Sequence, residues 1–80
     1  MLKDKQMPEI DAAIGQEDWQ FLLDNFHLLA EAVSIRVDVG DSPDEIYRYV
    51  LRAVGMWRQP IALRCRHAAQ YLLSEKMEGR

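Results

Sequence analysis

Two histidines and one cysteine are the side chains of this 80-residue chain best suited to catalysis or metal binding. His27 has Asp24 three residues before it and Glu31 four residues after it, and such carboxylates can orient a histidine for acid–base chemistry. The same spacing is typical of ordinary pairs on a helix surface. Cys65 and His67 are two residues apart, and no H-x-x-x-H or C-x-x-C spacing occurs. The four glycines are scattered, so there is no phosphate loop, and we expect no enzyme, no metal site and no cofactor.

Positive charge is concentrated in one stretch of the sequence. Residues 46–73, IYRYVLRAVGMWRQPIALRCRHAAQYLL, contain five arginines and one histidine and no acidic residue. Residues 1–45 carry 11 acidic and three basic side chains (net −8), whereas residues 46–80 carry seven basic and two acidic ones (net +5), and the whole chain has net charge −3. This asymmetry favours an anionic partner. The alternative is that the two halves attract each other, within one chain or across a dimer.

The length of the chain indicates a single helical domain, residues 1–80, with ends at 1–6 and 77–80 that we expect to be frayed. Apolar residues make up 49% of the chain, which is enough for a packed core and argues against disorder. A core of this size is marginally stable, and a single cysteine cannot form an internal disulfide. Stability must therefore come from close helix packing or from self-association.

The N-terminal residues MLKDKQMPEID are polar and do not resemble a signal peptide. No apolar run approaches the roughly 18 residues that a membrane span needs. With one free thiol and no targeting signal, we expect a cytoplasmic protein that does not contact a membrane.

The spacing of apolar residues predicts a compact all-α bundle of about four helices. The first is expected to be short, from Pro8 to Gly15, and the second to cover residues 17–34. Ser42 and Glu45 form the S-x-x-E pattern of a capping box, which predicts a third helix that ends at Gly55. The last helix is expected at residues 60–76.

The second predicted helix, EDWQFLLDNFHLLAEAVS, is apolar on two sides, and Asp18 is a candidate for its N-cap. A main apolar face runs along it at helical spacing from Trp19. Phe21, Leu28 and Ala32 form a second stripe at i, i+7 and i+11, about 180° from the first. A helix that is apolar on two sides is usually buried on two sides. We therefore expect this stripe to contact a second copy of the chain or another protein.

Residues 34–39, SIRVDV, change the period of the pattern. Ile35, Val37 and Val39 alternate with polar residues, as they would in a strand. A lone strand needs a partner for its backbone groups, and no second strand is predicted. The segment either pairs with its copy in a dimer or is an extended connection packed on the helices, and we favour the extended connection.

The helical positions place most of the arginines of residues 46–73 outside the predicted core. Those of the third helix lie opposite its apolar face, and the fourth helix carries others on its outer side. If the two helices pack antiparallel, the cations merge into one basic patch, for which the alternative is an ordinary solvated face. Trp57 lies in the connector, where we expect it to cover the core as a lid; alternatively, it contacts a partner directly. The candidate partner-binding face is Arg48, Arg52, Trp57, Arg58, Arg64, Arg66, His67 and Tyr71.

These features predict a small, non-enzymatic protein–protein interaction or regulatory module. We expect it to self-associate and to bind an acidic protein surface through its arginines, because the planar guanidinium group suits carboxylates. An adaptor domain that belongs to, or is bound by, a larger effector remains an alternative that the sequence does not separate from this one.

A DNA-binding regulator is the alternative from another class. A strand at 34–39, a capped helix at 42–54 and a helix at 60–76 resemble the ribbon-helix-helix family, and RHAAQYL (66–72) is similar to the R-x-A-x-x-x-L run of that family's second helix. The resemblance covers about half of the chain and implies a dimer whose paired strands enter the major groove. Asp38 would then face the DNA, and this departs from the family's pattern because the phosphates repel an acidic side chain. A helix-turn-helix at 43–73 would instead use Arg64, Arg66 and His67 to read bases, and the net charge of −3 makes nucleic acid the less favoured partner.

Overall fold

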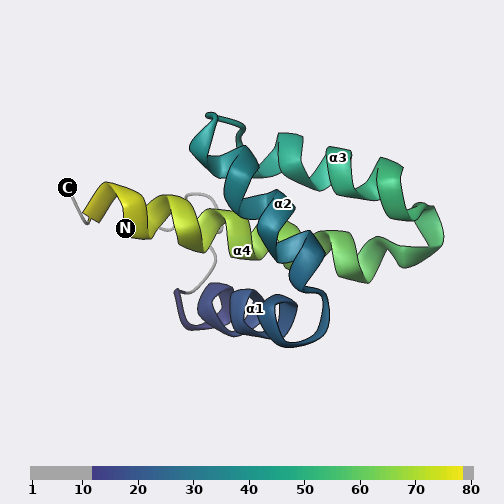
Figure 1. Ribbon diagram of the computed structural model, residues 1–80, viewed down its shortest axis with the longest axis horizontal. Helices are drawn as coiled ribbons and strands as arrows, with labels where there is room; N and C mark the ends of the chain where they lie inside the picture. Colours follow the sequence, from purple (N-terminus) through teal and green to yellow (C-terminus); the bar gives the residue numbers. More distant parts are fainter. Residues whose placement is uncertain (1–11, 79–80) are drawn as a thin grey trace, which may run out of the picture.

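Four α-helices and one 3₁₀ turn make up residues 12–78, the part of the chain that the computed structural model describes (Figure 1). They are α1 (Ala12–Asn25), α2 (His27–Asp38), α3 (Pro43–Val54), the 3₁₀ turn η2 (Met56–Arg58) and α4 (Gln59–Glu78). No strand occurs in this range, so the predicted all-α bundle of four helices is confirmed. Of the ends predicted to be frayed, residues 77–78 belong to α4, whereas residues 1–6 and 79–80 lie outside the described range, as does Pro8.

The long helix α4 is the central element of the fold. It lies between α1 and α3, which do not contact each other, and α2 crosses it (Figure 1). The residues of α4 that are fully buried between these helices are all small. Small side chains allow helix backbones to approach closely, so that three helices can pack on one. The buried small residues of α4 are Ala62, Cys65, Ala68 and Ala69.

The helices α1 and α4 approach each other closely at Gly15. A Cβ atom at this position would lie 2.8 Å from the Cβ of Tyr71 and 3.1 Å from the carbonyl oxygen of His67. The sequence predicts that Gly15 ends a short first helix, but it lies inside α1, where the close approach of α4 requires a residue without a side chain. The first helix is therefore longer than predicted, at 14 residues.

A break at Phe26 divides the predicted second helix into α1 and α2. Phe26 has φ −142° and ψ 58°, outside the helical region, and the side-chain amide of Asn25 donates a hydrogen bond to the carbonyl oxygen of Phe21 at 3.0 Å. An unbroken helix from Ala12 to Asp38 would be about 40 Å long. The longest dimension of the Cα trace is only 37 Å, and the break allows both helices to pack on α4 instead.

The prediction of an extended segment at residues 34–39 is wrong, because residues 34–38 form the last turns of α2. Val37 joins Ala30 and Val33 on the buried side of α2 at helical spacing, whereas Ile35 and Val39 lie on the exposed side. The alternation therefore arose from apolar residues on both sides of one helix. The strand on which the resemblance to the ribbon-helix-helix family depended is absent, because this segment is helical.

The start of α3 is as predicted from its sequence. Glu45 N–H donates to the hydroxyl oxygen of Ser42 at 3.2 Å, and Ser42 N–H donates to the Glu45 carboxylate at 2.8 Å, which completes the capping box. Ile46 and Val50 are fully buried in the core. The cap therefore determines where α3 begins, and the spacing of its apolar residues determines which face is buried.

We expect Gly15→Ala to destabilise the protein, although alanine is the better helix former. The new methyl group would meet the Tyr71 Cβ and a backbone oxygen, neither of which can rotate away, so α1 and α4 must separate. We predict a loss of about 1–3 kcal/mol in the free energy of unfolding, measured by urea denaturation. A variant as stable as the parent, as helix propensity alone would give, would contradict this account of the helix contact.

Candidate functional site

The structure divides the arginine-rich stretch into two groups that differ in their surroundings. Arg64, Arg66 and His67 on α4 contact acidic residues of α1 and α3. Arg48, Arg52 and Arg58 lie exposed on α3 and η2. The single basic patch that the helical positions predicted is therefore not continuous.

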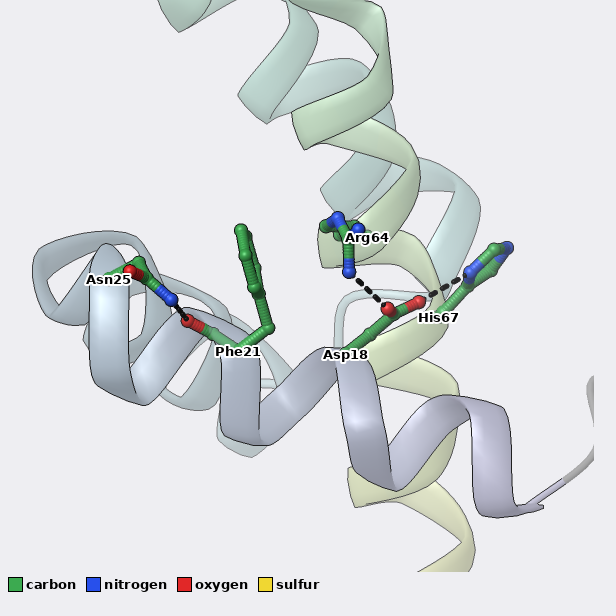
Figure 2. Close-up of polar contacts among 5 residues, drawn as sticks. All are labelled: Asp18, Phe21, Asn25, Arg64 and His67. Atoms are coloured by element: carbon green, nitrogen blue, oxygen red, sulfur yellow. Dashed lines mark hydrogen bonds and ion pairs between the residues drawn. The ribbon is translucent and has the colours of Figure 1, made fainter.

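Asp18 of α1 is the buried polar residue at the centre of the first group, with only 7% of its surface exposed. One carboxylate oxygen accepts a hydrogen bond from Arg64 Nη1 at 2.8 Å, and the other lies 2.8 Å from His67 Nδ1 (Figure 2). Arg64 and His67 are three residues apart on α4, so both side chains reach the same carboxylate. Asp18 was predicted as a helix cap, but it lies inside α1 and holds α1 against α4.

The aromatic ring of Phe21 is also part of this contact. The Arg64 guanidinium carbon lies 4.1 Å from the centre of the Phe21 ring. The centres of the Phe21 and Phe26 rings are 5.9 Å apart. Figure 2 shows Phe21 and Asp18 on the same side of α1, next to Arg64. Phe21 therefore packs within the molecule and does not belong to an outer stripe with Leu28 and Ala32, which lie on α2.

Arg66 and Tyr71 also connect helices. Arg66 Nε donates to the Asp44 carboxylate of α3 at 2.9 Å, and the Cβ of Tyr71 packs against Gly15 of α1. The sequence predicts Arg64, His67 and Tyr71 on the outer side of α4, but α1 packs against that side. These contacts join acids of the first 45 residues to bases of the last 35, as the alternative explanation of the charge asymmetry proposed.

The second group forms a surface at the turn between α3 and α4, which we call the basic tip. Its three arginines make no ion pair with any side chain in residues 14–77. Met56 and Trp57 are 71% and 75% exposed, so large apolar side chains lie beside these cations. A shallow pocket is lined by Arg48, Leu51, Arg52 and Met56. The basic tip comprises Arg48, Leu51, Arg52, Met56, Trp57 and Arg58.

Trp57 does not cover the core as a lid, because three quarters of its surface is exposed and it is not packed against the core. Gly55 has φ +96°, a conformation that side chains disfavour, and a Cβ there would lie 3.2 Å from the indole ring. The guanidinium carbon of Arg58 lies 4.4 Å from the centre of the ring. Gln59 donates to the Tyr47 hydroxyl at 2.9 Å and fastens the turn to α3. Trp57 thus contacts Arg58, and most of its surface is exposed.

A second exposed apolar surface lies on α2 and on Val39, the residue that follows its end. Leu28, Ile35 and Val39 are 72%, 59% and 69% exposed, and Ala32 lies between them at spacings of four, three and four residues. We call these four residues the α2 outer face. The sequence identified Leu28 and Ala32, but Ile35 and Val39 were missed because residues 34–39 were interpreted as extended.

The residues considered for catalysis or metal binding are not assembled. His27 begins α2, whereas Asp24 lies before the helix break and accepts a hydrogen bond from Gln20. Cys65 is fully buried, as predicted, and burial raises the pKa of its thiol to about 12. Within residues 12–78, no group of three or more histidine, cysteine or acidic side chains could hold a metal ion. None of the helices in this range is long and apolar enough to cross a membrane.

Comparison of the chain with protein-family models, with curated proteins and with solved structures found no match. What the protein does is therefore inferred from its own residues and their geometry.

We expect Asp18→Ala to destabilise the protein by about 2 kcal/mol, because it leaves Arg64 and His67 beside an apolar side chain without their acceptor. Asp44→Ala is the matched control, since it also removes an ion pair to α4, but an exposed one. We expect it to cost less than about 1 kcal/mol. Urea denaturation measures both changes, and equal losses would show that Asp18 has no special role.

Cys65 is expected to be inert in the folded protein. With a pKa of about 12 instead of 9.0, few molecules carry the thiolate that attacks thiol reagents at neutral pH. A chromogenic disulfide reagent should modify Cys65 only after unfolding in urea, and rapid reaction of the native protein would contradict the burial.

The raised pKa of Cys65 also predicts how stability depends on pH. Above pH 9 the thiol ionises first in the unfolded chain, so the free energy of unfolding should fall as the pH rises toward 12. Urea denaturation at several pH values measures this fall, and Cys65→Ala should lack this contribution.

Proposed function

We propose that the protein is a non-enzymatic helical interaction module, acting in the cytoplasm, that binds an acidic segment of another protein through the basic tip. The observation that carries this proposal is the exposure of Trp57 and Met56 beside three arginines without an ion-pair partner in residues 14–77. Tryptophan and arginine are the residues in which protein–protein binding energy is concentrated, and methionine is enriched at interfaces.

The geometry of the tip makes Trp57 accessible as a central contact for a partner. The Arg58 guanidinium already lies over one face of the indole ring, and the other exposed parts of the ring are open to a partner. The pocket next to it has an apolar part from Leu51 and Met56 and a cationic part from Arg48 and Arg52. A partner segment with an apolar side chain flanked by carboxylates would fill both parts.

The charge of the tip favours an acidic partner over a neutral one. No acidic residue occurs between Ile46 and Ser74, so Arg52 and Arg58 have no acidic neighbour along the sequence. The acids nearest to Arg48 already have other partners, since Asp44 accepts from Arg66 and Glu45 accepts from the Ser42 N–H. Although the whole chain is acidic, a local group of cations steers a negatively charged partner at short range, within a Debye length of about 8–10 Å.

A nucleic-acid partner is less well supported by the positions of the arginines. The helix-turn-helix hypothesis uses Arg64, Arg66 and His67 as base-reading side chains, but Asp18 and Asp44 already bind these three residues. Reading DNA would require these contacts to open. A DNA duplex therefore serves as the competing ligand in the test of the proposal.

We expect a fluorescein-labelled peptide of alternating glutamate and leucine to bind the protein, with an affinity that falls as salt is added. Trp57→Ala and Arg52→Glu should each weaken binding at least about tenfold, as measured by fluorescence anisotropy, because each removes a central contact of the tip. Met77→Ala and Lys76→Glu are the matched controls, since they make comparable changes at exposed positions near the other end of α4.

The proposal fails if the control variants weaken peptide binding as much as the tip variants do, since binding would then follow net charge alone. It also fails if a labelled DNA duplex binds at the same salt concentration and the peptide does not. A lysine–leucine peptide of the same length should show no binding.

A further inference from the structure

The α2 outer face is an apolar surface that no side chain in residues 14–77 covers. Leu28, Ala32, Ile35 and Val39 follow one another at spacings of four, three and four residues, which is the spacing of the seam in a two-helix coiled coil. On the opposite side of α2, Ala30, Val33 and Val37 are buried in the core, so this helix is apolar on both sides. A helix with this pattern is usually buried on both sides.

Two charged residues flank this face on opposite sides. On a helix with 100° per residue, Glu31 lies about 60–70° to one side of the centre of the face and Arg36 lies about 70° to the other. Glu31 is exposed. Arg36 is held at its edge by Asp41 at 3.2 Å and by the Tyr49 ring, whose centre is 4.0 Å from the guanidinium carbon.

We infer that a second copy of this chain covers the α2 outer face, with the two α2 helices side by side and parallel about a two-fold axis. In this arrangement the residues of the seam meet their own copies, and the small Ala32 lets the helices approach near the middle. Glu31 and Arg36 are five residues apart and on opposite flanks, so Glu31 of each copy faces Arg36 of the other. The charge pair therefore forms twice.

An antiparallel pair fits these charges less well. Residues on the same flank then face each other across the interface. Asp38 lies on the same flank as Glu31, so two acids would meet, and Arg36 would lose its partner in the other copy. The charges flanking the seam therefore select the parallel arrangement.

The small size of the protein supports this pairing and does not depend on the proposed function of the basic tip. Eighty residues with a single cysteine give a marginal core. Burying a second side of α2 removes three large exposed side chains from water, which stabilises the dimer relative to two monomers.

Sedimentation equilibrium of the full chain tests the pairing, with a dimer of the 9.3 kDa chain as the expected result. Ile35→Glu should raise the dimer dissociation constant at least about tenfold, because it places a charge in the apolar seam. Met56→Glu makes the same kind of change at the exposed basic tip and should leave the dimer intact. Circular dichroism checks that both variants keep their helices.

Oxidation of Leu28→Cys tests the direction of the helices. In the parallel dimer the two new cysteines are neighbours and form a disulfide, while Cys65 is buried and cannot interfere. In an antiparallel dimer residue 28 would face residue 39 of the other copy, about 16 Å along the helix from residue 28 of that copy, and only a mixture of the Leu28→Cys and Val39→Cys proteins would form the cross-link.

Three results would overturn the inference. A monomer at every concentration would leave the α2 outer face for a helix of a different protein. A dimer that Ile35→Glu does not weaken would place the interface elsewhere, and cross-linking only in the mixture would reverse the direction. None of these results bears on peptide binding by the basic tip, which Trp57→Ala tests separately.

Discussion

The close packing of three helices on the small residues of α4 is the constraint from which the other features of this fold follow. Ala62, Cys65, Ala68 and Ala69 leave room for helix backbones to approach, and Gly15 does the same from the side of α1. Small side chains bury little apolar surface per residue. The core therefore depends on larger residues from the surrounding helices, such as Leu22, Ile46 and Val50. Any change that separates α1 from α4 removes contacts along the whole helix pair.

The charges of the surrounding helices complement those of α4. Each of the three interacts with a base of α4 through one acid: Asp18 of α1 with Arg64 and His67, Asp44 of α3 with Arg66, and Asp38 of α2 with Lys76 at 3.4 Å. The pairs that involve Asp38 and Asp44 are exposed and contribute little stability, whereas the buried Asp18 contributes more. Much of the charge asymmetry of the sequence is thus used inside one molecule. The arginines of the basic tip do not take part, which is why they stand out as a separate feature.

The parts of this fold that were predictable from the sequence are those determined by neighbouring residues. The capping box of Ser42 and Glu45 and the amphipathic pattern after it located α3, and the pattern of Cys65 placed its thiol in the core. The break at Phe26 was not predictable, because it follows from the packing of both halves on α4. The end of α2 was misinterpreted because apolar residues occupy both of its sides and imitate the period of a strand. The ion pairs of Asp18 join residues 46 or more positions apart, for which sequence spacing gives no signal.

The basic tip and the α2 outer face differ in chemistry, and this difference suggests how they would work together. The tip combines one tryptophan with arginines, which suits a small and reversible contact, since much of its binding energy would come from few side chains. The α2 outer face is aliphatic and suits a lasting contact with its own copy. A dimer joined through α2 carries two tips. A partner with two acidic segments could then bind both, and its affinity would exceed that of one tip without any new kind of contact, provided that the segments can span the distance between them.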